Sequence, residues 1–171
     1  MAMFGFLSFG SVLAFLDLAA KNQVESRDKK EFPKELPGTN GKIWLYQNHN
    51  PGFSFGILKE CPKAMELVPL CVTSAFAGAW TYIMGKRGCL VEKLAATLVL
   101  AGGVSNLYDR MKRGYVVDYF SIRWKWLKKV VFNLGDFFIF TGSALFVLLS
   151  VVGTLKEIKA DLKGEFNDEK V

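Results

Sequence analysis

Four long apolar segments alternate with polar stretches along this 171-residue chain. They cover residues 4–20, 64–84, 89–108 and 133–152, near the roughly 20 apolar residues that a helix needs to cross a bilayer. The polar stretches predict two extramembrane loops, 21–63 and 109–132, and a charged tail at 156–171. The pattern predicts an α-helical integral membrane protein with four transmembrane helices, forming a single membrane domain over residues 1–171.

The first apolar segment is the shortest of the four. It lacks a basic leader and a convincing cleavage site, so we interpret it as a retained helix rather than a removed signal peptide. Asp17 and Lys21 lie near its end, four residues apart and on one helix face. They form either a simple ion pair at the membrane interface or a brace for a functional site.

The two long loops differ in composition. Lys42–Asn48 is rich in aromatic and branched residues, which predicts a strand in a small β-containing loop domain. The loop between the third and fourth apolar segments mixes Trp124 and Trp126 with basic residues, which predicts an interfacial segment at the lipid headgroups.

Composition agrees with a membrane protein, since 51% of the residues are hydrophobic and the mean hydropathy is +0.22. The net charge of +6 comes from bases that flank the apolar segments, which favours an anionic lipid surface as partner and excludes nucleic acid. Cys61, Cys71 and Cys89 lack metal-ligand spacing, and His49 is the only histidine, so no zinc site is predicted.

Two acidic residues stand at the ends of neighbouring apolar segments. Asp109 follows the third segment and Asp136 opens the fourth, so a helical hairpin would return both carboxylates to one side of the bilayer. Each follows an asparagine by three residues, Asn106 and Asn133, on the same helix face. Two carboxylates within hydrogen-bonding reach share one proton near neutral pH, which is the chemistry of aspartic proteases.

Each of these acids also has a structural interpretation. Asn133 is a good helix N-cap, and Asp136 in the first turn would offset the helix dipole. Asp109 lies at a helix C-terminus, where the dipole opposes negative charge, but it could pair with Arg110 or Arg113.

Five sequence blocks resemble, in order and spacing, the signature motifs of the lipoprotein signal peptidase family, also called signal peptidase II. The blocks are Leu16-Asp17 with Lys21, Asn50-x-Gly52-x-x-Phe55-Gly56, Asn106-Leu107-Tyr108-Asp109-Arg110, Gly114-Tyr115-Val116-Val117-Asp118-Tyr119 and Phe132-Asn133-Leu134-Gly135-Asp136. Each block alone is weakly specific, but together the resemblance extends from Leu16 to about Leu149.

The resemblance implies a four-helix aspartyl protease that removes signal peptides from prolipoproteins by cleaving before the diacylglyceryl-modified cysteine. It implies that Asp109 and Asp136 are the catalytic dyad, without metal or cofactor. The residues that would orient dyad or substrate, or support the site, are Asn106, Arg110, Asn133, Asp17, Lys21, Asn50 and Gly52. Membrane lipids would surround the enzyme, and globomycin-type cyclic peptides would inhibit it.

The resemblance also implies a topology in the bacterial inner membrane. Both termini would be cytoplasmic, and the loop domain and dyad would lie near the outer leaflet. Charge counting argues the opposite, because 15 of the 22 lysines and arginines lie in segments 21–63 and 110–130, and such loops usually stay inside. We adopt the family topology as the expectation.

The chain departs from the family pattern near the expected site. Ser105 stands in place of a usual glycine, Gly135 in place of a usual alanine, and Pro51 and Ser54 in place of common small residues. These changes leave both aspartates in place but bear on substrate range and loop shape. The alternative function is a non-catalytic relative that binds lipidated peptides or assists membrane assembly, and a third is a small transporter that uses the acids as a proton path.

Overall fold

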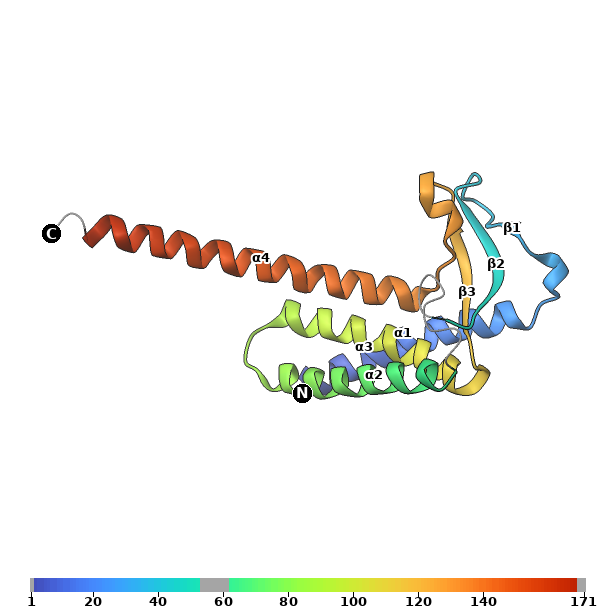
Figure 1. The fold of residues 1–171 in the computed structure, drawn as a ribbon, viewed down its shortest axis with the longest axis horizontal. Coiled ribbons are helices and arrows are strands. Elements are labelled where there is room, and N and C mark those ends of the chain that lie inside the picture. Colours follow the sequence, from blue (N-terminus) through green and yellow to red (C-terminus); the bar gives the residue numbers. More distant parts are fainter. Residues whose placement is uncertain (1, 53–61, 169–171) are drawn as a thin grey trace.

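The computed structural model of the chain describes residues 2–52 and 62–168. Four long helices dominate it: α1 (Ala2–Glu25), α2 (Pro62–Gly85), α3 (Leu90–Arg113) and α4 (Leu134–Asp168) (Figure 1). Each contains a stretch long and apolar enough to cross a membrane. The predicted four-helix membrane architecture is therefore confirmed. α4 continues as one helix to Asp168, through most of the predicted charged tail.

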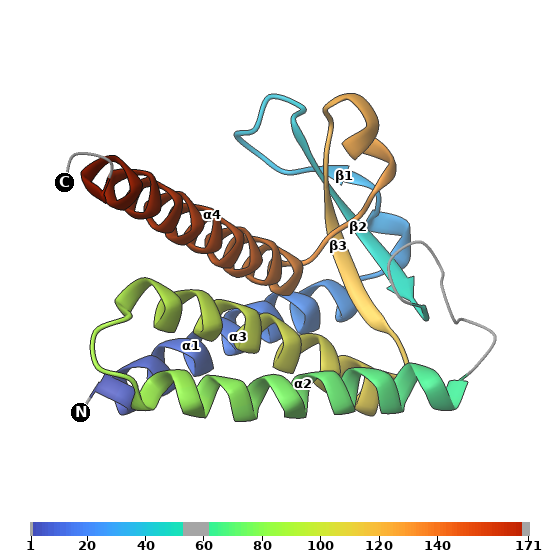
Figure 2. The ribbon, with the colours of Figure 1, turned by 60° about the vertical axis from the view of Figure 1, so that its left-hand side comes forward.

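α3 is the central helix, in contact with α1, α2 and α4. α4 packs on α3 near its beginning and then diverges from the other three helices (Figure 2). The two backbones approach closely where α4 begins, because a methyl group at Gly102 would collide with the Gly135 carbonyl oxygen. A glycine at position 102 is what brings the start of α4 against α3.

The apolar side chains lie either on the outer faces of the helices or in buried clusters. Phe4 and Val147 are 71% and 64% exposed on the outer faces of α1 and α4, as expected where lipid rather than water surrounds a helix. The buried apolar residues form two clusters. The cluster among the helices contains Trp80, Met84 and Ala96. The cluster beneath the sheet contains Val24, Val117 and Tyr119.

A small antiparallel sheet lies at one end of the helices, with its strands running across the helix axes (Figure 1). Its order is β1 (Lys34–Glu35), β2 (Ile43–Asn50) and β3 (Val116–Ile122). β2 contains the strand predicted at Lys42–Asn48, apart from its first residue. β3 was not predicted as a strand, because its residues fall inside the segment that we assigned to the interface. Asn48 pairs with Asp118 just beyond a bulge in the β2–β3 register.

The chain reaches β3 through a tight turn at Gly114, whose left-handed backbone (φ 76°) ends α3. After β3, a short 3-10 helix, η3 (Lys125–Lys129), leads back to α4, and another, η1 (Lys29–Glu31), follows α1. α1 and α3 therefore end, and α4 begins, beside the sheet. The beginning of α1 and the end of α4 point away from the sheet (Figure 1).

Candidate active site

Asp136 lies in the first turn of α4, where it forms two hydrogen bonds with Asn133. The Asn133 side-chain oxygen accepts a hydrogen bond from the Asp136 backbone N–H (2.8 Å), and Asp136 Oδ2 accepts one from the Asn133 backbone N–H (3.2 Å). This reciprocal arrangement is a helix capping box. Asp136 Oδ1 accepts from Asn106 Nδ2 on α3 (3.0 Å). The structural interpretation of Asn133 and a role in the site are therefore compatible.

A second carboxylate, that of Asp118 on β3, shares Asn133 with Asp136. Asn133 Nδ2 donates to Asp118 Oδ1 (2.8 Å), and Asn50 Nδ2 donates to Asp118 Oδ2 (3.1 Å). Asp118 is only 4% exposed. Burial and the neighbouring charge of Asp136 raise the pKa of Asp118 to about 7. The two acids thus interact, and Asp118 changes protonation near neutral pH.

Both acids line a cavity of about 630 Å³ formed by α2, α3, α4, the sheet and the segment before α4. Asn50, Asn106 and Arg110 add polar groups to its lining. Most of the remaining wall is apolar and includes Val72, Phe76, Val99, Leu107, Ile139 and Phe140. A cavity with a few polar groups on an apolar wall can hold an apolar chain beside a polar reaction centre.

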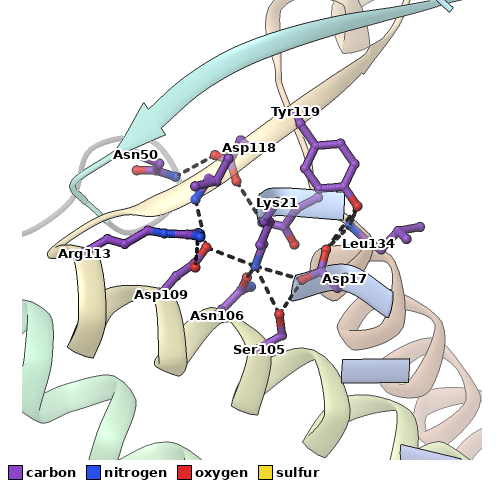
Figure 3. Close-up of polar contacts among 12 residues, drawn as sticks. Asp17, Lys21, Asn50, Ser105, Asn106, Asp109, Arg113, Asp118, Tyr119 and Leu134 are labelled. Atoms are coloured by element: carbon purple, nitrogen blue, oxygen red, sulfur yellow. Dashed lines mark hydrogen bonds and ion pairs between the residues drawn. The ribbon is translucent and has the colours of Figure 1, made fainter. Parts of the chain in front are cut away.

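Asp109, the expected partner of Asp136, lies in a different environment. It is fully buried, and its Oδ1 accepts from Arg113 Nη1 (2.5 Å). Its Oδ2 lies 3.4 Å from Lys21 Nζ (Figure 3). The same oxygen accepts a hydrogen bond from the Val117 backbone N–H (3.1 Å). Two bases and an amide thus engage both oxygens, and Asp109 is not among the described residues that line the cavity.

The geometry therefore favours Asp118, rather than Asp109, as the partner of Asp136. The predicted catalytic role of Asp109 finds no support in its contacts, which instead match the alternative in which it pairs with Arg113. The helical hairpin does return Asp109 to the sheet end of the molecule. Its side chain, however, packs against Lys21 of α1.

Lys21 joins the predicted residues of α1 and α3, and it is fully buried. Its ammonium lies 2.8 Å from Asp17 Oδ2 and donates to Asn106 Oδ1 (2.7 Å). Because Lys21 binds the side-chain oxygen of Asn106, the amide nitrogen of Asn106 points to Asp136. Asp17 and Lys21 therefore form a buried ion pair, and Lys21 also contacts Asn106.

Asp17 also fixes the start of α4. Its Oδ1 accepts hydrogen bonds from the Leu134 backbone N–H (3.0 Å) and from the Tyr119 hydroxyl (3.1 Å) (Figure 3). The Leu134 amide belongs to the first turn of α4, where backbone N–H groups lack partners within the helix. One carboxylate on α1 thereby positions β3 and the turn that carries Asp136.

The turn after β2 is held by Arg110 and Gly52. Arg110 Nη2 donates to the Gly52 carbonyl oxygen (3.0 Å), and the Gly52 N–H donates to Asn50 Oδ1 (3.1 Å). These contacts leave the Asn50 amide nitrogen facing Asp118. Arg110 and Gly52 thus act on the acid pair through Asn50. Residues 53–56 of the predicted loop motif lie outside the described residues.

This arrangement is suited to general acid–base chemistry. An acid that titrates near neutral pH lies beside a second carboxylate, and amide groups from β2, α3 and the start of α4 orient both. Within residues 2–52 and 62–168, no group of three or more His, Cys, Asp or Glu side chains is placed to hold a metal ion.

Comparison with known proteins identifies the family of the chain. The family model for signal peptidase (SPase) II matches residues 10–152. The chain belongs to the signal peptidase II family. This membership confirms the resemblance noted in the sequence.

Relatives match most of the chain in sequence, and a solved structure shares its fold. A lipoprotein signal peptidase of Moorella thermoacetica is 34% identical over 134 residues, covering 77% of this chain and 85% of the relative. That of Allorhizobium ampelinum is 32% identical over 148 residues, with 86% and 87% covered. A structure described as a bacterial membrane enzyme has the same fold, with a TM-score of 0.74 at 19% identity over 88% of this chain and 89% of that one.

Two residues of this candidate site have no role in the sequence predictions, Asp118 and Ser105. The sequence predictions include Asp118 only as part of a block that resembles the family, with no role of its own. The available signal was a charged residue inside a run of branched and aromatic residues, Val116–Phe120, where a strand would bury it. The sequence predictions include Ser105 only as a departure from the family pattern.

Proposed function

We propose that this signal peptidase II family member is a membrane aspartic endopeptidase that removes signal peptides from prolipoproteins. It cleaves before the diacylglyceryl-modified cysteine. Family membership and the relatives named lipoprotein signal peptidase support this activity. The observation that carries the mechanism is the pair Asp118 and Asp136, which share Asn133 and line a largely apolar cavity.

In the proposed mechanism Asp118 and Asp136 share one proton. The ionised carboxylate accepts a proton from water as the water oxygen attacks the scissile carbonyl carbon, and the protonated carboxyl donates to the carbonyl oxygen. The tetrahedral intermediate then collapses, the C–N bond breaks, and the acid pair returns a proton to the leaving amine. Hydrogen bonds from Asn50, Asn106 and Asn133 orient the carboxylate oxygens.

Asp109 takes a supporting role in this proposal. Together with Asp17 it surrounds the Lys21 ammonium, and Lys21 orients Asn106 toward Asp136. The buried charges offset one another, so they hold α1, α3 and β3 together without entering the reaction.

The apolar part of the cavity supports a lipidated substrate. Apolar side chains of α2, α3 and α4 line it beside Asp136, so a diacylglyceryl group can lie there while the peptide passes the acid pair. A globomycin-type cyclic peptide with an apolar tail would occupy the same space. We therefore propose that such peptides compete with the substrate.

We further propose that the protein resides in the bacterial cytoplasmic membrane with its termini in the cytoplasm and its active site near the outer leaflet. The beginning of α1 and the end of α4 point away from the sheet, which supports termini on one side and the site on the other (Figure 1). Trp124 and Trp126, 63% and 70% exposed beside the lysines of η3, would contact the lipid headgroups of the site's leaflet.

The deciding experiment is cleavage of a diacylglyceryl-modified prolipoprotein by the purified protein in detergent. We expect turnover by the wild type and a loss of at least about 10³-fold in kcat for Asp118→Asn or Asp136→Asn, since each removes half of the acid pair. The matched variant Asp109→Asn should keep measurable turnover per folded molecule, because Asp109 does not line the cavity and the single amide oxygen of asparagine can still accept one of its two hydrogen bonds, from Arg113 or from Val117.

Two results would contradict the proposal in different ways. Full activity of Asp118→Asn with complete loss in Asp109→Asn would restore the dyad expected from the sequence. Binding of the lipopeptide by a folded wild type without any turnover would favour the non-catalytic alternative.

A further inference from the structure

The polar cluster around Asp17 contains a side chain that the proposed mechanism does not use, that of Ser105 on α3. Ser105 is fully buried. Its hydroxyl donates to Asp17 Oδ2 (2.6 Å) and accepts from Lys21 Nζ (3.2 Å) (Figure 3). One hydroxyl therefore contacts both members of the buried ion pair and fixes where the Asp17 carboxylate lies.

Gly135 in the first turn of α4 packs against the same carboxylate. A methyl group at position 135 would lie 2.9 Å from Asp17 Oδ2, 3.0 Å from Asn133 Oδ1 and 3.2 Å from Asn106 Oδ1. Carbon–oxygen contacts are ordinarily about 3.3 Å or longer. The position in which Ser105 holds Asp17 is therefore open only because residue 135 carries no side chain.

Two chains of contacts lead from this point to Asp136. In the first, Lys21 donates to Asn106 Oδ1, and Asn106 Nδ2 donates to Asp136. In the second, Asp17 Oδ1 accepts the backbone N–H of Leu134, two residues before Asp136. A shift of the Asp17 carboxylate would thus move both the side chain that donates to Asp136 and the backbone that carries it.

We propose that Ser105 is a positioning residue of this peptidase and that it acts as a matched pair with Gly135. The Ser105 hydroxyl sets Asp17 and Lys21, and through them Asn106 and the first turn of α4. Ser105 is not among the described residues that line the cavity, so it acts on the reaction without contacting substrate. The inference rests on the proposed peptidase function.

The test compares kcat and KM for prolipoprotein cleavage among single and double variants. Ser105→Ala should lower kcat about tenfold, the scale of one lost hydrogen bond to a charged group, with KM unchanged. Gly135→Ala should lower kcat roughly hundredfold, because its methyl pushes Asp17 toward Ser105 and misplaces Asp136. Adding Ser105→Gly to Gly135→Ala opens space for Asp17, so the double variant should be more active than Gly135→Ala alone.

Matched controls are Ser150→Ala, which removes an exposed hydroxyl of α4, and Gly153→Ala, which adds a methyl to α4 where nothing lies within 4 Å. Both should behave as wild type. If Gly135→Ala does not fold, the kcat of Ser105→Ala decides alone.

The outcomes separate this inference from the function on which it rests. Wild-type cleavage with independent effects of the two sites, or with Ser105→Ala at wild-type kcat, would overturn the matched pair only. Absence of wild-type cleavage would overturn the proposed function and this inference together.

Discussion

At the residue scale, Asn133 links two acids from different elements, Asp118 of β3 and Asp136 of α4, through hydrogen bonds to both. Its backbone N–H and side-chain oxygen bond Asp136, and its side-chain nitrogen bonds Asp118. It is fully buried, so water does not compete for these contacts. The two carboxylates are therefore held in a fixed relation, and the charge of Asp136 acts on the protonation of Asp118.

This coupling predicts the pH dependence of the reaction. The pKa of Asp118 is raised to about 7, so Asp118 is protonated below that pH and ionised above it. Because the mechanism needs the shared proton, kcat/KM should fall as the pH rises through about 7. Asn50→Ala removes a hydrogen bond that favours the ionised Asp118, so the pKa of Asp118 should rise further and the alkaline limb should move to higher pH.

The measurement is kcat/KM against pH, which reports the groups of the free enzyme. Gln23→Ala, an exposed position on α1, is the control and should leave the profile unchanged. An alkaline limb at the same pH in Asn50→Ala and wild type would contradict the assignment of this limb to Asp118.

The sequence predicts a role for Asp136, but it does not indicate that Asp118 shares Asn133 with it. Asp136 opens an apolar helix, and Asn133 three residues earlier marks that opening. Asp109 has the same local pattern, yet its neighbours are decided by where Lys21 of α1 and Arg113 lie. Which acid meets Asp136 depends on the docking of β3 beside the start of α4, a tertiary contact that spacing along one helix does not encode.

At the element scale, β3 brings the membrane helices and the loop domain to one site. Successive side chains of a strand point to opposite faces. Val117 and Tyr119 pack with Val24 in the cluster beneath the sheet, while Asp118 between them meets Asn50 and Asn133. The alternation of β3 thus places Asp118 toward the site and Val117 and Tyr119 toward α1.

Elements differ in how much of them the sequence reveals. A lipid-spanning helix is specified by its own apolar run, because its backbone hydrogen bonds are internal, and all four were predicted. A strand needs a partner, and β3 pairs with β2, which precedes it by two helices. Basic residues and tryptophans follow β3 in the sequence. Because of them, the whole segment between α3 and α4 was predicted to lie at the membrane interface, and the strand was not predicted.

The surface of η3 carries a prediction about lipid contact. Trp124 and Trp126 should lie among headgroups, held there by Lys125 and Lys128 at about 1 kcal/mol per base near an anionic surface. In nanodiscs made with brominated anionic lipid, tryptophan fluorescence of the wild type should be quenched more than that of Lys125→Gln/Lys128→Gln.

A control with the same change in charge is Lys29→Gln/Lys30→Gln in η1, which should be quenched as strongly as wild type. Equal quenching in all three proteins would contradict the assignment of η3 to the anionic surface. High salt should reduce the difference, because it screens exposed charges.

At the scale of the whole molecule, the site explains part of the conflict between charge count and topology. Of the 15 bases in the two long loops, Lys21 and Arg110 are buried. Arg113 pairs with Asp109, so it too belongs to the folded site. Lysines and arginines that are held in a folded site say less about the orientation of the protein in the membrane than solvent-exposed loop bases do. The charge bias for a cytoplasmic location of the two long loops is therefore weaker than the number of their bases suggests. The family topology is the better expectation.

Orientation can be measured by cysteine labelling in spheroplasts. In a background with Cys61, Cys71 and Cys89 replaced by serine, Lys30→Cys on the sheet side should react with an impermeant maleimide in intact cells. Arg87→Cys, in the turn between α2 and α3 at the other end, should react only after lysis. The reverse pattern would place the acid pair on the cytoplasmic side, where a lipoprotein signal sequence threaded outward could not present its cleavage site. Labelling therefore tests the proposed substrate as well as the orientation, because only an outward-facing site can meet a modified cysteine at the outer leaflet.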